Sequence, residues 1–431
     1  LGSAGFRHQG LATEDQELSY EGDQLVRGVA QDYLNRLIER GGAWGRKDSP
    51  TTKLSFDHEL AKVVLEGMMA EAGVDIWFNA QFVDVVMDGN RIVGLLVSTN
   101  GGLNVIWAKT VVDSSGNGEV AYRAGVPFEV GRKKDGRPQA SSIYFLVGGV
   151  DIHKTLDYLK QNPDELRREG PSSKSTPEVL EQRLKEGKPL MFTGFERARR
   201  KAVENGDFPA ALGAQGPVYQ LGPIRTLWRG GRVEPYITSH NMDTCFGVMP
   251  TNRKELAEAV MASRRFILGL VDFYRKYIPG YEDSYLLLSA PMFGVRESRR
   301  IVGDYVLSEE DVLEGREFMD AVGRCGAYVD IHDEDGGVRP IYLREVGGDK
   351  GWYHVPYRIL LPRDVEGLLT AGRCVSADHI AQGSIRNQAG CMTTGHAAGA
   401  AAALSVQQGT TPREVDVEVL QTTLRGQAAI I

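Results

Sequence analysis

The amino-acid sequence predicts an α/β fold that carries an inserted region of mixed α+β character. Residues 110–113 form an apolar run that enters a Ser-Ser-Gly-Asn-Gly turn at 114–118, which is typical of a buried strand reaching a tight bend. The order of strand, glycine turn and helix returns after Trp352. Between about residues 131 and 355, mixed charges and frequent Pro and Gly indicate a separate domain.

The first part of the chain predicts two helices followed by short strands. One helix is expected over 23–40, because a Gly-Gly pair follows it as a stop signal. A second begins after Ser55 as its N-cap and ends at Gly73, with apolar residues at helical spacing between them. Strands separated by Asp-Gly-Asn and Asn-Gly-Gly turns are then expected over 75–79, 82–87, 91–98 and 103–108.

The inserted region and the end of the chain are less regular. Helices are expected in the insert at 176–187, 251–277 and 308–323, with a polar exposed loop at 163–177. The last part predicts a strand over 367–372, a polar loop over 373–387 and a helix of small residues over 389–408.

Charge and cysteine content exclude several classes of protein. Lys and Arg number 50 against 57 Asp and Glu, so no basic surface is indicated and we expect no nucleic-acid partner. No run of 18 apolar residues is present, so we expect no membrane span. The four cysteines form no CxxC pair, which favours a reducing compartment, and no signal peptide is visible; we therefore expect a cytoplasmic protein.

Two features could hold a nucleotide. Small residues after the strand at 110–113 would let the backbone approach a ligand closely, although an ordinary glycine turn gives the same pattern. A helix that begins near Gly390 would offer free N–H groups and its positive dipole end to an anion. An alanine-rich core helix is the alternative for this second feature.

In combination, these features resemble the FAD-dependent oxidoreductases whose FAD domain is of the glutathione reductase type. The matching stretches follow one another along most of the chain: 55–108, 111–119, 124–128, 294–300, 303–305, 329–333, 355–358 and 371–399.

The resemblance implies FAD as the cofactor and a discontinuous, Rossmann-like three-layer FAD domain. That domain would comprise residues 1–130 and 356–408, with a substrate or cap domain at 131–355 and a helical tail at 409–431. The resemblance also implies which residues contact the cofactor: Gly2, Ser3, Val83, Asp113, Ser114, Gly116, Gly372, Arg373, Ser384, Arg386, Thr394 and Gly395.

The family's first βαβ unit, with its G-x-G-x-x-G motif, is not found in these 431 residues. We therefore expect an N-terminal fragment or a partner subunit to carry that motif, in a homo- or hetero-oligomer. Loss of FAD binding is the remaining alternative.

Flavin dehydrogenation requires a base that takes a proton as hydride leaves the substrate. By sequence context the candidates for catalysis are His379, and His354 together with Tyr357 and Arg358. The expected reaction is hydride transfer from a hydroxyl or amine carbon of a small polar substrate to flavin N5. Action as a reductase or an oxidase, or as a non-catalytic subunit, stays open, as do structural roles for these histidines.

Three further groups have weaker signals. Arg296, Arg299 and Arg300 could bind a carboxylate or form structural ion pairs. An acidic stretch containing His332, over 330–335, could hold a cation, but we expect a turn and no metal. Cys391 could have a lowered thiol pKa or link to a flavin, but we expect a buried small residue.

Overall fold

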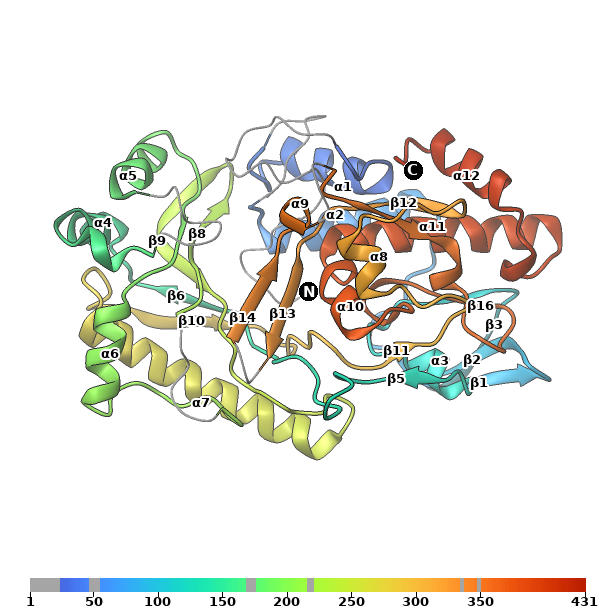
Figure 1. Ribbon diagram of the computed structural model, residues 1–431, viewed down its shortest axis with the longest axis horizontal. Coiled ribbons are helices and arrows are strands. Elements are labelled where there is room, and N and C mark those ends of the chain that lie inside the picture. The colour runs from blue at the N-terminus through green and yellow to red at the C-terminus, as the bar shows by residue number, and fades with distance from the viewer. Residues whose placement is uncertain (1–23, 46–54, 168–175, 215–220, 334–336, 347–349) are drawn as a thin grey trace.

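The computed structural model describes residues 24–45, 55–167, 176–214, 221–333, 337–346 and 350–431. Gly2 and Ser3, which were expected at the cofactor, lie outside these residues, as does most of the loop expected at 163–177. Figure 1 shows a three-stranded sheet and the C-terminal helices at one end of the molecule, and a larger sheet with a long helix at the other.

The helices have these bounds: α1 (Val29–Glu39), α2 (His58–Glu71), α3 (Glu119–Arg123), α4 (Ile152–Gln161), α5 (Pro177–Lys185), α6 (Glu196–Glu204), α7 (Arg253–Tyr277), α8 (Glu309–Leu313), α9 (Leu343–Val346), α10 (His379–Ile385), α11 (Gln388–Gln408) and α12 (Val417–Gly426). Short 3-10 turns lie at η1 (Pro163–Glu165), η3 (Tyr357–Leu360), η4 (Gly372–Cys374) and η5 (Pro412–Glu414).

The strands have these bounds: β1 (Gln81–Asp88), β2 (Arg91–Thr99), β3 (Gly102–Trp107), β4 (Val111–Asp113), β5 (Phe128–Glu129), β6 (Phe145–Gly148), β7 (Met191–Phe192), β8 (Ile224–Arg229), β9 (Arg232–His240), β10 (Tyr285–Ser289), β11 (Arg300–Ile301), β12 (Ala321–Cys325), β13 (Val329–Asp333), β14 (Gly337–Ile341), β15 (Tyr353–Pro356) and β16 (Leu368–Thr370).

Two distant strands form a parallel pair. β16 pairs with β4 in parallel, with Leu368 opposite Val111 and Thr370 opposite Asp113. α11 packs on both strands, and its Ser405 hydroxyl lies 3.1 Å from that of Thr110. This arrangement confirms the predicted α/β class, because a parallel pair needs a long crossover and a covering helix.

The antiparallel sheet β1-β2-β3 confirms the predicted hairpins. The strand expected at 75–79 is wrong: these residues form no strand, and the side chains of Trp77 and Phe78 are exposed. An extended segment counts as a strand only where it pairs, and no described strand lies beside this one.

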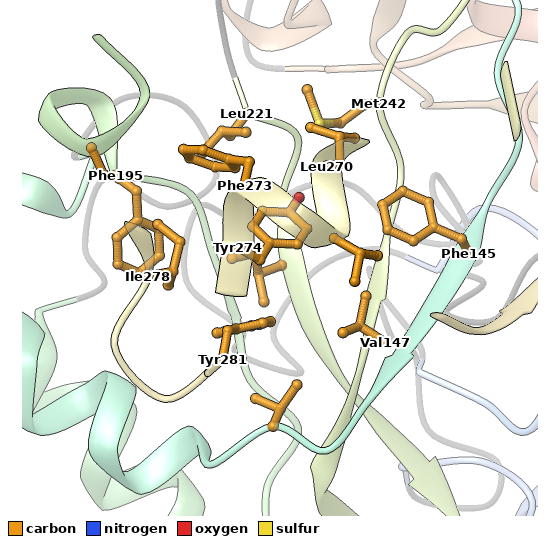
Figure 2. Packing of buried hydrophobic residues seen from close by; sticks show 14 of the residues in the cluster. Phe145, Val147, Phe195, Leu221, Met242, Leu270, Phe273, Tyr274, Ile278 and Tyr281 are labelled. Atoms are coloured by element: carbon orange, nitrogen blue, oxygen red, sulfur yellow. The ribbon is translucent and has the colours of Figure 1, made fainter. Parts of the chain in front are cut away.

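The insert contains a five-stranded antiparallel sheet in the order β10-β6-β9-β8-β7. The expected helix at 251–277 is present as α7 and packs its buried face against this sheet, where Phe145, Leu270, Tyr274 and Tyr281 meet in an aromatic core (Figure 2). The buried residues of this core all fall between residues 143 and 290.

Three predictions of local structure are wrong. The helix expected over 308–323 stops after α8, because Gly315 adopts a left-handed φ of 63°, and the strand β12 follows and pairs with β15. The polar loop expected over 373–387 contains α10, which Asp378 caps by accepting a bond from the Ala381 N–H. The second helix is likewise capped by Asp57 and not by Ser55.

Residues 307–355 of the insert share a hydrophobic core with 357–424 of the C-terminal part. The domain bounds given above stay a prediction. Among the described residues, no helix combines the length and apolar character needed to cross a membrane.

Candidate functional site

The turn after β4 is built around a buried carboxylate. Asp113 is 1% exposed, and its two carboxylate oxygens accept bonds from the N–H groups of Ser115 and Ala121 at 2.9 and 3.0 Å. Gly116 has a φ of 76°, and a Cβ there would lie 2.8 Å from Nη2 of Arg373. The turn therefore needs glycine at 116 both for its conformation and for the approach of the arginine.

Arg373 connects this turn to the start of α11. Its Nη2 donates to Oδ1 of Asn117 at 2.9 Å, whereas its buried Nη1 has no hydrogen-bond partner among the described residues. Gly372 has a φ of 78°, and its N–H donates to the Thr394 hydroxyl on α11 at 3.0 Å. Burial lowers the pKa of Arg373 from its usual value. The structure thus brings together Asp113, Gly116, Gly372, Arg373 and Thr394 from the predicted set.

The N-terminus of α11 is open to an anion. Asn387, its N-cap, makes no side-chain capping bond, and the helix has 21 residues, so the positive end of a long dipole is not satisfied by a cap. Gln388 Oε1 and Thr393 Oγ1 in its first turns are buried without a partner in the described structure. A buried polar atom without a partner is costly, which favours a ligand at this end.

Other predicted cofactor residues lie in different surroundings. Ser384 is fully buried. Its hydroxyl donates to the Ala327 carbonyl and accepts from the Tyr353 hydroxyl, so both of its hydrogen bonds are made within the protein core. A Cβ on Gly395 would meet no atom within 4 Å, and Val83 is half-buried on β1. Ser114 lies on the turn itself and is exposed.

Beside α10 lies a buried group of charges, which we call the arginine–histidine cluster: Arg296, Asp243, His332, Asp330 and Arg386. Arg296 pairs with Asp243 at 2.9 Å, and Arg386 Nη2 lies 3.3 Å from Asp330 Oδ2. His332 lies between the two acids, with Nδ1 2.9 Å from Asp243 and Nε2 2.9 Å from Asp330.

The acids decide the charge of this histidine. Burial alone would lower the pKa of His332, as Arg296 does, but Asp243 and Asp330 outweigh both and the pKa is raised. Burial likewise opposes the ionised form of Asp330, yet His332 and Arg386 hold the pKa of that carboxyl well below its usual value.

A second group surrounds Glu297, which is fully buried. Its carboxylate contacts the Arg300 guanidinium and lies 3.0 Å from Nδ1 of His379. The Gln139 N–H donates to Glu297 at 3.0 Å, and the Gln139 side chain donates to Gln382. Since Gln139 also accepts a bond from Arg386 at 3.1 Å, the two groups form one continuous network.

The other predicted catalytic residues use their polar atoms elsewhere. His354 Nδ1 accepts from the Phe318 N–H, and burial lowers the pKa of this histidine. Tyr357 donates to the Pro412 carbonyl, and burial raises its pKa. Arg358 pairs with Asp320 at 2.9 Å. The structure does not join these three to the network around His379.

The structure also locates two of the weaker signals. Residues 330–333 belong to strand β13, which pairs with β14, and residues 334 and 335 of the expected turn lie outside the described residues. Burial of its thiol raises the pKa of Cys391 to about 11, so the thiol is not activated, although the residue as a whole is half-buried and not fully buried as expected. Among the described residues, no group of His, Cys, Asp and Glu could hold a metal ion.

Sequence reasoning missed Asp243, Glu297 and Gln139. Glu297 had a signal, because it lies among Arg296, Arg299 and Arg300, and a carboxylate within an arginine-rich stretch is a candidate for an ion pair. Asp243 had none, since its partner His332 is 89 positions away in the chain.

These features define a flavoprotein oxidoreductase when they are set beside known proteins. Residues 5–424 match the family described as FAD dependent oxidoreductase, so the chain belongs to that family. The predicted cofactor, FAD, and the prediction of an enzyme are confirmed at this level. No curated protein matches the chain in sequence.

Several solved structures of flavin enzymes are similar at low identity. They include p-nitrophenol 4-monooxygenase PnpA from Pseudomonas putida, with 10% identity over 97% of this chain and 67% of that one, at a TM-score of 0.37. A geranylgeranyl bacteriochlorophyll reductase-like protein from Thermoplasma acidophilum has 13% identity over 99% and 66%, at 0.36. The flavin-dependent brominase Bmp2 has 12% identity over 96% and 75%, at 0.38. The chain thus spans about two thirds of the length of the first two, and its reaction has to be argued from its own residues.

The residues present fit FAD. The unpartnered Nη1 of Arg373 and the uncapped end of α11 would receive an anionic part of the cofactor.

Proposed function

We propose that this protein, with FAD bound, removes hydride from a hydroxyl or amine carbon of a small polar substrate. FAD, when bound, supplies the hydride acceptor at its N5 atom. The proposal rests mainly on His379, which begins α10 and lies 3.0 Å from the carboxylate of Glu297. This pair belongs to the network that Gln139 joins to Arg386, just before α11.

His379 is suited to act as the base. With Nδ1 donating to Glu297, Nε2 becomes the nitrogen that accepts a proton from a substrate hydroxyl or amine. The carboxylate would also stabilise the imidazolium that forms, and Arg300 contacts the same carboxylate. In this assignment Glu297 and Arg300 position the base, and His379 is the residue that takes the proton.

Anaerobic reduction of the flavin tests the proposal. The FAD-loaded protein would be mixed without oxygen with a panel of small hydroxy and amino compounds, and the loss of the oxidised flavin absorbance recorded. With an active compound, His379→Gln should slow flavin reduction by about 10²–10⁴-fold. The exposed His153 on α4 provides the control, because His153→Gln should leave the rate unchanged. Equal rates in the two variants would contradict the role of His379.

The same experiment separates the alternative directions. Reduction by a substrate, with slow reoxidation in air, fits a dehydrogenase. Rapid reoxidation by air fits an oxidase, and no reduction by any donor of the panel, together with oxidation of the reduced flavin by an activated alkene, fits a reductase.

A second candidate is a partner-completed enzyme. In the described part of the chain β4 pairs only with β16, so its other edge is unpaired there. An unpaired strand edge favours contact with a further strand-bearing unit. We propose that this unit carries the G-x-G-x-x-G motif, on an N-terminal extension or on another subunit. Intact mass measurement of every polypeptide in native material tests this, and FAD retained by a single chain of 431 residues would contradict it.

The compartment stays a proposal as well. All four cysteines are free thiols, and three of them are buried, which agrees with a reducing environment such as the cytoplasm.

A further inference from the structure

The contacts of His332 indicate its protonation state. Both ring nitrogens lie 2.9 Å from carboxylate oxygens, and a neutral imidazole can donate from only one nitrogen. Since neighbouring cations also lower the pKa of both carboxyls, the carboxylates accept and both nitrogens donate, which makes His332 an imidazolium cation between Asp243 and Asp330.

The arginine–histidine cluster then holds an excess of positive charge. Three cations, Arg296, Arg386 and His332, face two carboxylates. The neighbouring Glu297 does not supply the balance, because it already contacts Arg300 and His379. Glu129, which lies 3.4 Å from Arg300, is 54% exposed and is on the solvent side. A buried excess charge is costly, so an anion in this place would be strongly favoured.

Donors remain for such an anion. Arg386 makes three hydrogen bonds, all through Nη2. Its side chain is 10% exposed, and its Nε is buried without a partner in the described structure. The Ser141 hydroxyl is also buried and unpartnered, next to Ala140, whose carbonyl accepts from Arg296. The excess charge and the unused donors therefore occur in the same place.

The cluster also lies between the sheet of the insert and α10. Asp243 follows β9 of the five-stranded sheet, whereas Asp330 and Arg386 belong to β13 and the end of α10; Figure 1 shows β13 between that sheet and α10. The five side chains keep 9–16% of their surface exposed, so the cluster is not sealed.

From these observations we propose that the cluster binds a carboxylate group of the substrate. This rests on the proposed function, because it names the substrate of the same site as a small hydroxy or amino acid. Arg386 and Arg296 would donate to the carboxylate, and His332 would act as a positioning residue that holds Asp243 and Asp330 in place. The neighbouring His379 would face the carbon that loses hydride.

Binding of a plain dicarboxylate tests this without any turnover. Succinate and its neutral counterpart succinamide would be titrated into the FAD-loaded protein by calorimetry. We expect succinate to bind on the order of 100-fold more tightly than succinamide, because the neutral amide leaves the cationic donors uncompensated. Arg296→Gln should remove most of this preference. Arg296→Lys should retain part of it, because lysine keeps the positive charge but lacks the paired N–H donors of the guanidinium.

A matched control removes an arginine from an ion pair elsewhere. Arg197 in the insert pairs with Asp164 and is 55% exposed, so Arg197→Gln should bind succinate as the unchanged protein does. Far-ultraviolet circular dichroism and flavin content would establish that each variant is folded and loaded.

The outcomes are distinct. Equal affinity for succinate and succinamide, or no binding of either, would overturn the proposal. So would a change of flavin reduction potential in Arg296→Gln with unchanged succinate binding, which would assign the charge to the flavin ring instead. Preference for succinate in a protein whose flavin no donor reduces would uphold the carboxylate site and refute the dehydrogenase.

Discussion

Two buried histidines show how neighbours set the chemistry of a site. His240 lies in the aromatic core of the insert, with its ring 5.0 Å from that of Phe145 and 4.9 Å from that of Tyr274 (Figure 2 shows both partners), and burial lowers its pKa to about 3. His332 lies between two carboxylates with 11% of its side chain exposed, and its pKa is raised. Burial alone makes a histidine an uncharged packing residue, whereas burial with paired acids makes it a fixed cation.

The largest expected effect comes from removing a carboxylate beside His332. Asp243→Asn removes the partner of both Arg296 and His332 and leaves buried positive charge unbalanced. We expect a loss of about 3–5 kcal/mol in the free energy of unfolding. Urea denaturation near neutral pH measures it, and a loss below about 1 kcal/mol would show that the cluster is more hydrated than its contacts indicate.

The pH dependence of stability should have opposite signs for the two histidines. His240 has a lowered pKa, so its contribution is present above its unfolded pKa of about 6.5 and is lost as pH falls towards 3, by about 1.4 kcal/mol per pH unit. His332 has a raised pKa, so its contribution is present below about 6.5 and is lost as pH rises through its folded value.

Matched variants isolate these slopes. His240→Phe should keep the aromatic packing and remove the acid-side loss, and His332→Gln should remove the loss on the alkaline side. Unfolding free energies measured across pH 4–9 would compare them, and parallel curves for the unchanged protein and His240→Phe would contradict the assigned state of His240.

The smallest effect concerns a neutral hydrogen bond in the aromatic core. The Tyr281 hydroxyl lies 3.1 Å from that of Thr238, which also contacts His240 at 2.8 Å. Tyr281→Phe should cost about 1 kcal/mol of unfolding free energy, because Thr238 retains its contact with the histidine. Thermal unfolding of both proteins would measure it, and a cost equal to that of Asp243→Asn would remove the distinction between the two regions.

What the sequence could predict followed from local pattern. The helix α7 and the hairpins of β1–β3 were expected because their periodicity and turn residues lie within a few positions. The turn containing Gly116 and the start of α11 were expected from their small residues, and the structure brings both to Arg373.

What the sequence could not predict depends on distant partners. Residues 75–79 could form a strand only beside a pairing partner, which their own sequence does not reveal. The helix α10 is too short for a clear helical periodicity. The contact between Asp243 and His332 joins positions far apart in the chain. The sequence around His332 did not indicate which carboxylates would contact this histidine. His354 and Tyr357 were near the predicted site by sequence, but their polar atoms bind Phe318 and Pro412.

The pairing of β4 with β16 has a consequence for how the chain acquires its structure during synthesis. Asp113 and Thr370 are register partners, although more than half of the chain lies between them. The core of the insert, between residues 143 and 290, can close on the ribosome before Thr370 has been made. The pairing beside the turn after β4 is thus completed late in translation, and a ribosome stalled before residue 368 would carry a folded insert without the β4–β16 pair.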